Sequence, residues 1–174
     1  MEGHRVTVLP IVIAPDPRLK VNCRPVETVD DDVRAVLDAM LETMYDAPGI
    51  GLAAPQVADE RRLIVIDVAR EGEDPQPLKI VNPEIAWAST ETCVMNEGCL
   101  SIPDIYYDVK RPERVRVQYL DETGAEREVQ ADGLLARCLQ HEIDHLNGVL
   151  FIDHLSRIKR NMTLAKMKKR KAGE

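Results

Sequence analysis

The chain has 174 residues, of which 44% are apolar and 30% charged, a composition typical of a single soluble globular domain. Aromatic residues make up only 3% of it, which argues against a surface that stacks single-stranded nucleic acid bases. The four cysteines form no Cys-x-x-Cys pair and favour a reducing compartment. Apolar residues 6–14 are interrupted by proline and too short to cross a bilayer, so they predict an opening segment of the fold rather than a signal peptide. We expect a cytoplasmic protein without membrane or DNA partners.

The first half of the chain contains one helical pattern and two strand patterns. Residues 30–46 carry apolar side chains at helical spacing with acids in the first turn, so they predict a helix that ends at Pro48-Gly49. The nearly continuous apolar run LIVIDV, residues 63–68, predicts a strand buried on both faces. Residues 78–89 predict another strand.

The second half begins with a strand pattern and continues as a helix. Residues 114–131 alternate apolar and polar side chains around the turn DETG, which predicts a hairpin. Asp132 is expected to cap a helix that runs to about Asn147 and stops at Gly148. The predicted class is α+β: mixed or antiparallel sheets around a central buried helix, followed by a basic C-terminal helix or tail.

The charge of the chain is divided unevenly. The formal net charge is −7, yet residues 157–174 carry eight basic residues and one acid, so residues 1–156 carry −14. We expect one domain, residues 1–155, with a basic extension, residues 156–174, whose last stretch, residues 164–174, ends in a frayed, partly helical tail. The extension is a candidate contact for RNA or another polyanion, and the alternative is a solvated helix end.

The predicted helix of residues 132–147 contains His-Glu-x-x-His. On a helix, His141 and His145 lie on one face about one turn apart, which suits two imidazole ligands on a single metal. Burial of two histidines and Glu142 in a core costs free energy unless something binds them. The alternative is that both histidines are core residues with their hydrogen bonds made within the protein, and that the glutamate is salt-bridged. Asp144 faces away from the metal, so we expect a supporting role rather than ligation. The residues expected to point away from this face are Arg137, Gln140, Asp144 and Asn147.

A catalytic metal site needs a third protein ligand. Zinc proteases commonly take one downstream, but the acids after His145 are Asp153 and Glu174, and the only later histidine is His154, so the supply there is poor. Upstream, Cys99 lies in a loop bounded by glycine and proline, where a thiolate would be a strong soft ligand. A lone cysteine is more often a small core hydrophobe.

Three segments in order, GIGLAAPQ (49–56), EGCLSIP (97–103) and QHEIDHLNG (140–148), resemble the three motifs of the peptide deformylases. The resemblance covers most of residues 8–155 and implies that these form a catalytic domain. It implies metal-dependent hydrolysis of the N-formyl group from N-formylmethionyl nascent polypeptides, with release of formate.

The resemblance also implies roles for individual residues. Glu142 would be the acid and base, while the Gln56 amide and the Leu100 backbone N–H would donate to the developing oxyanion. Family members typically use Fe(II) in the cell, and purified protein often carries zinc or nickel; the ligands would also accept cobalt. One divalent metal would be bound by Cys99, His141 and His145.

The resemblance implies a substrate pocket beside the metal. Residues Ile50, Gly51 and Gly98 would pair with the substrate as an added strand. Tyr106 stands where many members have a different, often basic residue. Arg111 would brace the Cys99 loop through Glu97, with an exposed surface arginine as the alternative. The pocket walls would be Ile50, Met95, Leu134, Cys138 and His141.

Two other functions compete with this interpretation. A metalloprotease of the His-Glu-x-x-His type would cleave internal peptide bonds and be indifferent to Cys99→Ala. A non-catalytic module would bind metal or nascent chains without turnover.

Because deformylases act on chains as they leave the ribosome, the basic C-terminal end is also expected to dock on ribosomal RNA.

Overall fold

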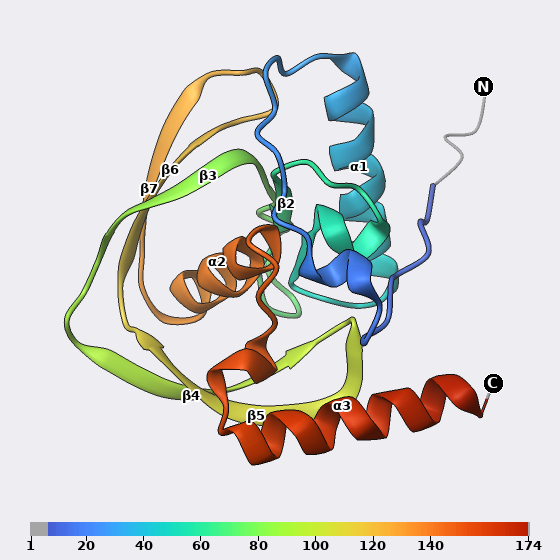
Figure 1. Ribbon diagram of the computed structural model, residues 1–174. Helices are drawn as coiled ribbons and strands as arrows, with labels where there is room; N and C mark the ends of the chain where they lie inside the picture. Colours follow the sequence, from blue (N-terminus) through green and yellow to red (C-terminus); the bar gives the residue numbers. More distant parts are fainter. Residues whose placement is uncertain (1–6, 174) are drawn as a thin grey trace.

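A computed structural model describes residues 7–173 of the chain, so the part of the predicted opening segment before Thr7 lies outside the described residues. Three α-helices and seven strands alternate with short 3₁₀ turns (Figure 1). The helices are α1 (Asp31–Asp46), α2 (Gly133–Leu146) and α3 (Arg157–Ala172). The strands are β1 (Gly51–Ala53), β2 (Leu63–Ile66), β3 (Leu78–Ala88), β4 (Thr92–Cys99), β5 (Ile102–Pro112), β6 (Val115–Leu120) and β7 (Glu126–Ala131).

The strands form two antiparallel units around helix α2. Five strands pair in the order β1-β2-β3-β6-β7, and β4 and β5 form a separate two-stranded ribbon. Figure 1 shows α2 in the middle of the molecule, with the sheet on one side and the ribbon on the other. The predicted α+β class with a central buried helix is confirmed.

Strand β2 is buried on both faces because a helix packs against each of them. Ile64 and Ile66 belong to the cluster formed with α2, whereas Leu63 and Val65 belong to the cluster formed with α1. All four side chains are 0% exposed. The continuous apolar run in the sequence is therefore explained by two helices that share one sheet. This packing fixes α2, and with it the His-Glu-x-x-His motif, against the sheet.

The prediction of a loop around Cys99 is wrong, because Cys99 is the last residue of strand β4. The chain turns at Leu100 and Ser101 and returns as β5, so Cys99 lies at the tip of the ribbon. The strand pattern was hidden because one face of β4 is exposed to solvent and Gly98 and Pro103 flank the turn. A strand end holds the thiol in place more rigidly than a free loop.

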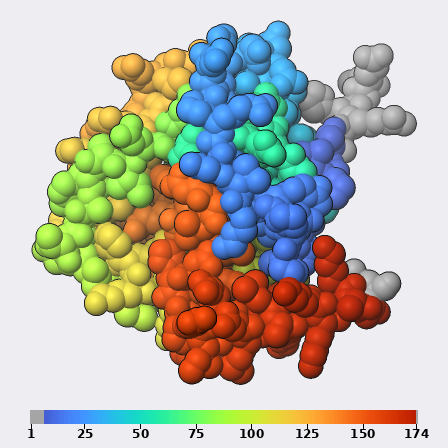
Figure 2. All heavy atoms as spheres, viewed as in Figure 1, coloured from blue at the N-terminus to red at the C-terminus, as the bar shows by residue number. Residues whose placement is uncertain are grey.

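Of the basic C-terminal helix or tail predicted from the sequence, the structure shows the helix, so only the expectation of a frayed end is wrong. Helix α3 begins at an N-cap, Ser156, which accepts a hydrogen bond from the Lys159 backbone N–H, and it buries Thr163 and Met167 against the body. It lies along strand β5 at the lower edge of the molecule (Figures 1 and 2). Packing, rather than helix propensity alone, accounts for its order. Within residues 7–173, none of the helices is both long and apolar enough to cross a membrane.

The predicted ends of helix α2 agree with the structure in position. Asp132 occupies the N-cap, although its side chain makes no capping hydrogen bond. Gly148 follows the helix with φ of +73°, a conformation that glycine adopts without strain. A Cβ there would lie 2.6 Å from the Lys20 carbonyl oxygen, so the helix end also requires glycine for space.

Candidate metal centre

Three potential metal ligands meet where the tip of the ribbon touches helix α2. The ligand atoms of Cys99, His141 and His145 all lie within 4.8 Å of one another. Cys99 Sγ is 3.3 Å from His145 Nε2, and the two imidazole rings have centroids 5.1 Å apart. His141 is 8% exposed and His145 0%. The helical spacing of the histidines and the position of the ribbon together produce the cluster.

The cluster fits a divalent transition metal. A tetrahedral ion with metal–sulfur and metal–nitrogen bonds near 2.3 and 2.0 Å places such ligand atoms roughly 3.5 Å apart, close to the observed sulfur–nitrogen distance. Burial lowers the pKa of His145 well below its ordinary value, so its imidazole is neutral and able to ligate. Burial also opposes charge on His141, but Glu142, Cys99 and Glu97 raise its pKa well above the ordinary value. The sulfur and nitrogen atoms of the three ligands therefore favour binding of a cation between them.

Glu97 orients the first histidine of the motif. One carboxylate oxygen accepts a hydrogen bond from His141 Nδ1 at 2.9 Å, which turns Nε2 of the ring toward the cluster. Arg111 donates to both carboxylate oxygens, at 2.6 and 2.9 Å. Burial raises the pKa of Glu97, but His141 and Arg111 outweigh it and hold this pKa well below the ordinary value. The predicted contact between Arg111 and Glu97 is confirmed, and the exposed-arginine alternative is wrong because Arg111 is 4% exposed.

The prediction that Arg137 and Gln140 point away from the histidine face is wrong for Arg137, which lines the same cavity as His141, and both side chains are buried. Arg137 donates to the Val109 carbonyl oxygen at 2.8 Å and also reaches Glu97, while Gln140 donates to the Pro112 carbonyl oxygen at 3.0 Å. The β4–β5 ribbon covers this polar side of α2, and its backbone accepts the hydrogen bonds. A helical pattern alone does not indicate that a second layer lies on the polar side.

Asp144 lies outside the ligand cluster and contacts residues that support it, as predicted. Its carboxylate accepts hydrogen bonds from Arg111 at 2.8 Å and from His154 at 2.8 Å. Arg111 therefore links two carboxylates, Glu97 on the ribbon and Asp144 on the helix. This buried bridge fixes the ribbon relative to the histidine helix.

We expect Glu97→Gln to weaken metal binding about 10- to 100-fold, because the carboxylate that orients His141 loses its charge. Competition with a chelator on Ni(II)-loaded protein measures the dissociation constant. Glu91→Gln is a matched control, since Glu91 is exposed and pairs with Arg114 at the surface. An unchanged affinity in Glu97→Gln, with unchanged circular dichroism, would contradict the role assigned to this carboxylate.

Glu142 lies beside the cluster in a nearly closed environment. It is 3% exposed, and its Oε1 has no hydrogen-bond partner among residues 7–173. Burial raises its pKa to about 7. A carboxyl group with this pKa is suited to accept and return a proton near neutral pH. Gly51 makes room for it, because a Cβ at Gly51 would lie 2.7 Å from Glu142 Oε2 and 2.8 Å from Cys138 Sγ.

The Gln56 amide is buried next to the cysteine ligand. Its Oε1 accepts a hydrogen bond from the Ala53 backbone N–H at 2.9 Å, and its Nε2 donates to Ser101 Oγ at 3.1 Å. Nε2 also lies 3.5 Å from Cys99 Sγ. The amide therefore structures its loop and at the same time faces the metal site. Sequence reasoning missed Ser101, whose hydroxyl helps to hold the amide in this direction.

A cavity of about 600 Å³ opens from the cluster to the surface. Met95 does not line it, because the cavity ends at Asn96 and Met95 lies opposite Val109 farther along the ribbon. Sequence reasoning missed several lining residues, among them Ile11, Ile13 and Asp104. The predicted residues that do line it are Gln56, Ile50, Gly51, Gly98, Cys99, Leu100, Tyr106, Leu134, Cys138, His141 and Glu142.

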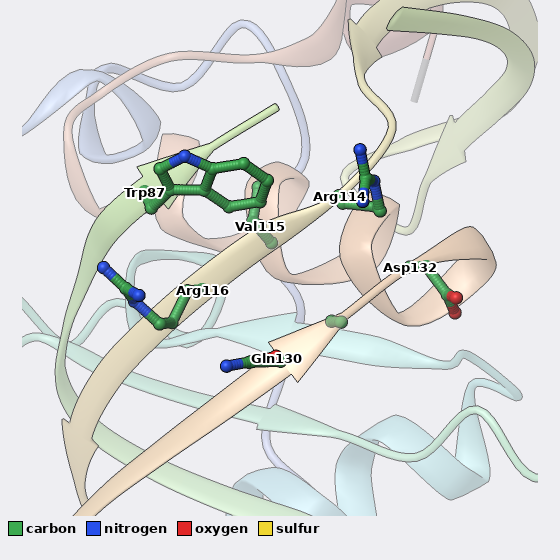
Figure 3. A pocket seen from close by; sticks show the side chains of 7 residues that line it. Trp87, Arg114, Val115, Arg116, Gln130 and Asp132 are labelled. Carbon is green, nitrogen blue, oxygen red and sulfur yellow. The ribbon is translucent and has the colours of Figure 1, made fainter. Parts of the chain in front are cut away.

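A second cavity, of about 470 Å³, lies on the end of the five-stranded sheet (Figure 3). Trp87, Arg114, Arg116 and Gln130 surround it, and Arg114 lies over the Trp87 ring at 5.8 Å. None of the predicted metal ligands or catalytic residues lines this cavity. The candidate active site is therefore the cavity at the Cys-His-His cluster.

The fold and this site define a metallohydrolase: a Cys-His-His cluster with both histidines buried, a glutamate within the His-Glu-x-x-His motif, and a cavity of about 600 Å³, a volume ordinary for ligand sites. A sequence model of the polypeptide deformylases matches residues 8–161. The peptide deformylase of Methylocella silvestris is 61% identical over 163 residues, covering 92% of this chain and 83% of that protein. The peptide deformylase of Rhizobium meliloti is 56% identical over 164 residues, covering 94% of each.

Solved structures agree with these relatives. The crystal structure of peptide deformylase from Ehrlichia chaffeensis matches with a TM-score of 0.90 at 44% identity, covering 95% of this chain and 98% of that one. A structure of the Ehrlichia chaffeensis enzyme in complex with actinonin also matches, with a TM-score of 0.90 and 46% identity over 94% of this chain and 98% of that one. The chain belongs to the polypeptide deformylase family.

Proposed function

We propose that the protein hydrolyses the formyl amide of N-formylmethionyl peptides and releases formate. The observation that carries the proposal is the position of Glu142 beside the Cys99–His141–His145 cluster, on a cavity open to the surface. Membership of the deformylase family supports it. A protease of the His-Glu-x-x-His type would not need Cys99, which here contacts His145 directly.

The residues around the cluster have different roles in the proposed reaction. A bound divalent metal would supply a Lewis acid. We propose Fe(II) in the cell because the resemblance to the bacterial deformylases implies it; the thiolate and imidazole ligands would also accept zinc, nickel or cobalt. Glu142 takes a proton from the attacking water and returns it to the leaving amine. The Gln56 amide and the Leu100 backbone N–H donate to the oxygen that gains negative charge.

The peptide is proposed to bind as an added strand. Strand β1 is at the edge of the five-stranded sheet, and the cavity runs between the segment 49–51 and the segment 96–100 of the ribbon. An extended peptide there can form backbone hydrogen bonds to both sides. The methionine side chain would enter the part of the cavity formed by Leu134, Cys138 and His141.

The test is formate release from a formyl-Met tripeptide by protein purified without oxygen and loaded with Fe(II). We expect rapid release that depends on the formyl group, with the unformylated peptide unchanged. Cleavage of the unformylated peptide at an internal bond would support a protease instead. Binding without release by the loaded protein would support a non-catalytic module.

The exposed side of helix α3 is a proposed contact with ribosomal RNA. We also propose a cytoplasmic location, which the four free cysteines support. Lys166, Lys168, Lys169 and Lys171 are all exposed, and Figure 2 shows α3 as a ridge along one edge of the molecule. Lysines clustered on one element attract phosphates, and the acidic body of the protein confines that attraction to the helix.

We expect the double variant Lys168→Gln/Lys169→Gln to co-sediment less with ribosomes and to reduce the slope of log affinity against log salt by about 1.5. The matched control is Lys110→Gln/Arg127→Gln, which removes the same charge from two exposed positions on the body. Substitution is preferable to truncation because α3 packs on the body through Met167. Equal loss in both double variants would contradict a specific role for the helix.

A further inference from the structure

One wall of the catalytic cavity is a short stretch of chain, residues 47–51, all of which line it. This stretch, the 47–51 wall, runs from the end of helix α1 into strand β1. Strand β1 is at the edge of the sheet and pairs there with β2. Gly51 lies so close to α2 that a Cβ on it would collide with Glu142. The position of the wall therefore determines where an added peptide strand lies relative to the catalytic carboxylate.

Asp67 is attached to this wall from both sides. Its backbone N–H donates to the Ile50 carbonyl oxygen at 2.9 Å. Its carboxylate accepts a hydrogen bond from the hydroxyl of Tyr45, which is in the last turn of α1, two residues before the wall begins. Asp67 therefore spans the wall, from the helix that precedes it to the strand in which it ends.

The Asp67 carboxylate is buried and held by neutral donors. The side chain is 6% exposed, and it also accepts hydrogen bonds from the backbone N–H groups of Ala69 at 3.0 Å and Gln76 at 3.2 Å. Burial raises the pKa of Asp67, but the hydrogen bonds outweigh burial and hold this pKa below its ordinary value. Burial and the Asp67 carboxylate raise the pKa of Tyr45 to about 12, so its hydroxyl keeps the proton that it donates. A buried charge is costly without partners, so the carboxylate and its donors fix one another in place.

We propose that Asp67 and Tyr45 are positioning residues that hold the 47–51 wall where it can pair with the backbone of the peptide substrate. This inference rests on the proposed deformylase function. Neither residue lines the cavity, so both act through the wall. The wall contacts the peptide as an added strand, whereas the formyl group lies at the metal. Loss of the Asp67–Tyr45 contact therefore weakens binding of an extended peptide more than binding of formyl-methionine alone.

The experiment compares a formyl-Met tripeptide with formyl-methionine amide, which has no further residues to pair with the wall, on Fe(II)-loaded protein. Tyr45→Phe removes only the hydroxyl. We expect its KM for the tripeptide to rise about 3- to 10-fold while kcat stays within about twofold of wild type. Its kcat/KM for formyl-methionine amide should also stay within about twofold of wild type. The preference for the tripeptide therefore falls.

Asp67→Asn should have a larger effect in the same direction, with KM for the tripeptide about 10-fold higher or more. The amide has one acceptor oxygen where the carboxylate has two, so at least one of its donors loses its partner. The matched controls are Tyr119→Phe, a half-buried tyrosine of β6 outside the cavity, and Asp38→Asn, an exposed acid on α1 that pairs with Lys79. Both controls should keep the wild-type values for both substrates.

The outcomes distinguish this inference from the function beneath it. An equal fall in kcat/KM for both substrates in Tyr45→Phe would indicate a general disturbance of the site and would overturn the inference alone. An unchanged KM for the tripeptide in this variant would overturn it as well, and this result decides the matter even if Asp67→Asn does not fold. Absence of formate release from both substrates by the metal-loaded wild type would overturn the proposed function and the inference with it.

Discussion

Glu142→Gln is expected to lower kcat/KM for formate release about 10⁴-fold without loss of metal. The substitution preserves the size of the side chain but removes its ability to accept a proton and return it, and this residue is proposed to do both. The carboxyl group suits the task because burial raises its pKa to about 7. It is not a member of the Cys-His-His ligand group, so metal content should stay at one ion per chain. Formate release and metal analysis on the same sample measure both quantities.

Gln56→Ala provides the comparison for this result. Loss of one oxyanion donor should cost about 10²–10³ in kcat, less than loss of the acid and base, and metal content should again be retained. Because the Gln56 amide also bonds to the Ala53 backbone and to Ser101, the thermal midpoint of this variant should be recorded with its activity. If Glu142→Gln kept more than about a tenth of wild-type activity, another group would have to move the proton.

The features that depend on local periodicity were predictable from the sequence. Sequence spacing indicates which side chains share a face of an element. This holds for the apolar stripe of α1, for the apolar run of β2 and for the pair His141 and His145. The order of three motifs then indicated the deformylase resemblance, which implied the cysteine ligand. These predictions needed no knowledge of how distant segments pack.

Several of the features that sequence reasoning missed depend on the β4–β5 ribbon. Its exposed face and the Gly98 and Pro103 positions hid the strand pattern, so Cys99 was expected in a loop. Without the ribbon, the helical pattern placed Arg137 and Gln140 away from the histidine face and gave no partner for them. Both are buried because ribbon carbonyl oxygens accept their hydrogen bonds. A periodic pattern indicates which side of a helix is polar, but not whether another layer covers that side.

Helix α3 was misjudged for a similar reason, and the misjudgement has a measurable consequence. Truncation after Leu155 is expected to lower the free energy of unfolding by about 4 kcal/mol or more. Met167 is 1% exposed and packs in the cluster that contains Phe151, Ile152 and Ile105, with Cys99 at its margin. Arg170 also donates to the Pro103 carbonyl oxygen at 2.8 Å, close to the tip of the ribbon. Removal of α3 uncovers apolar surface beside a metal ligand, so metal affinity should fall as well.

Point variants keep this prediction testable if the truncated chain does not fold. Met167→Ala should lower the free energy of unfolding by about 2–4 kcal/mol in urea titrations of metal-loaded protein, with an unchanged m-value. Met162→Ala is the matched control, because Met162 is on the same helix but 64% exposed, and should change stability by less than about 0.5 kcal/mol. A fully stable chain of residues 1–155 would instead establish the domain boundary expected from the charge pattern. The basic helix would then be an appendage, and its burial of Met167 would contribute little to the fold.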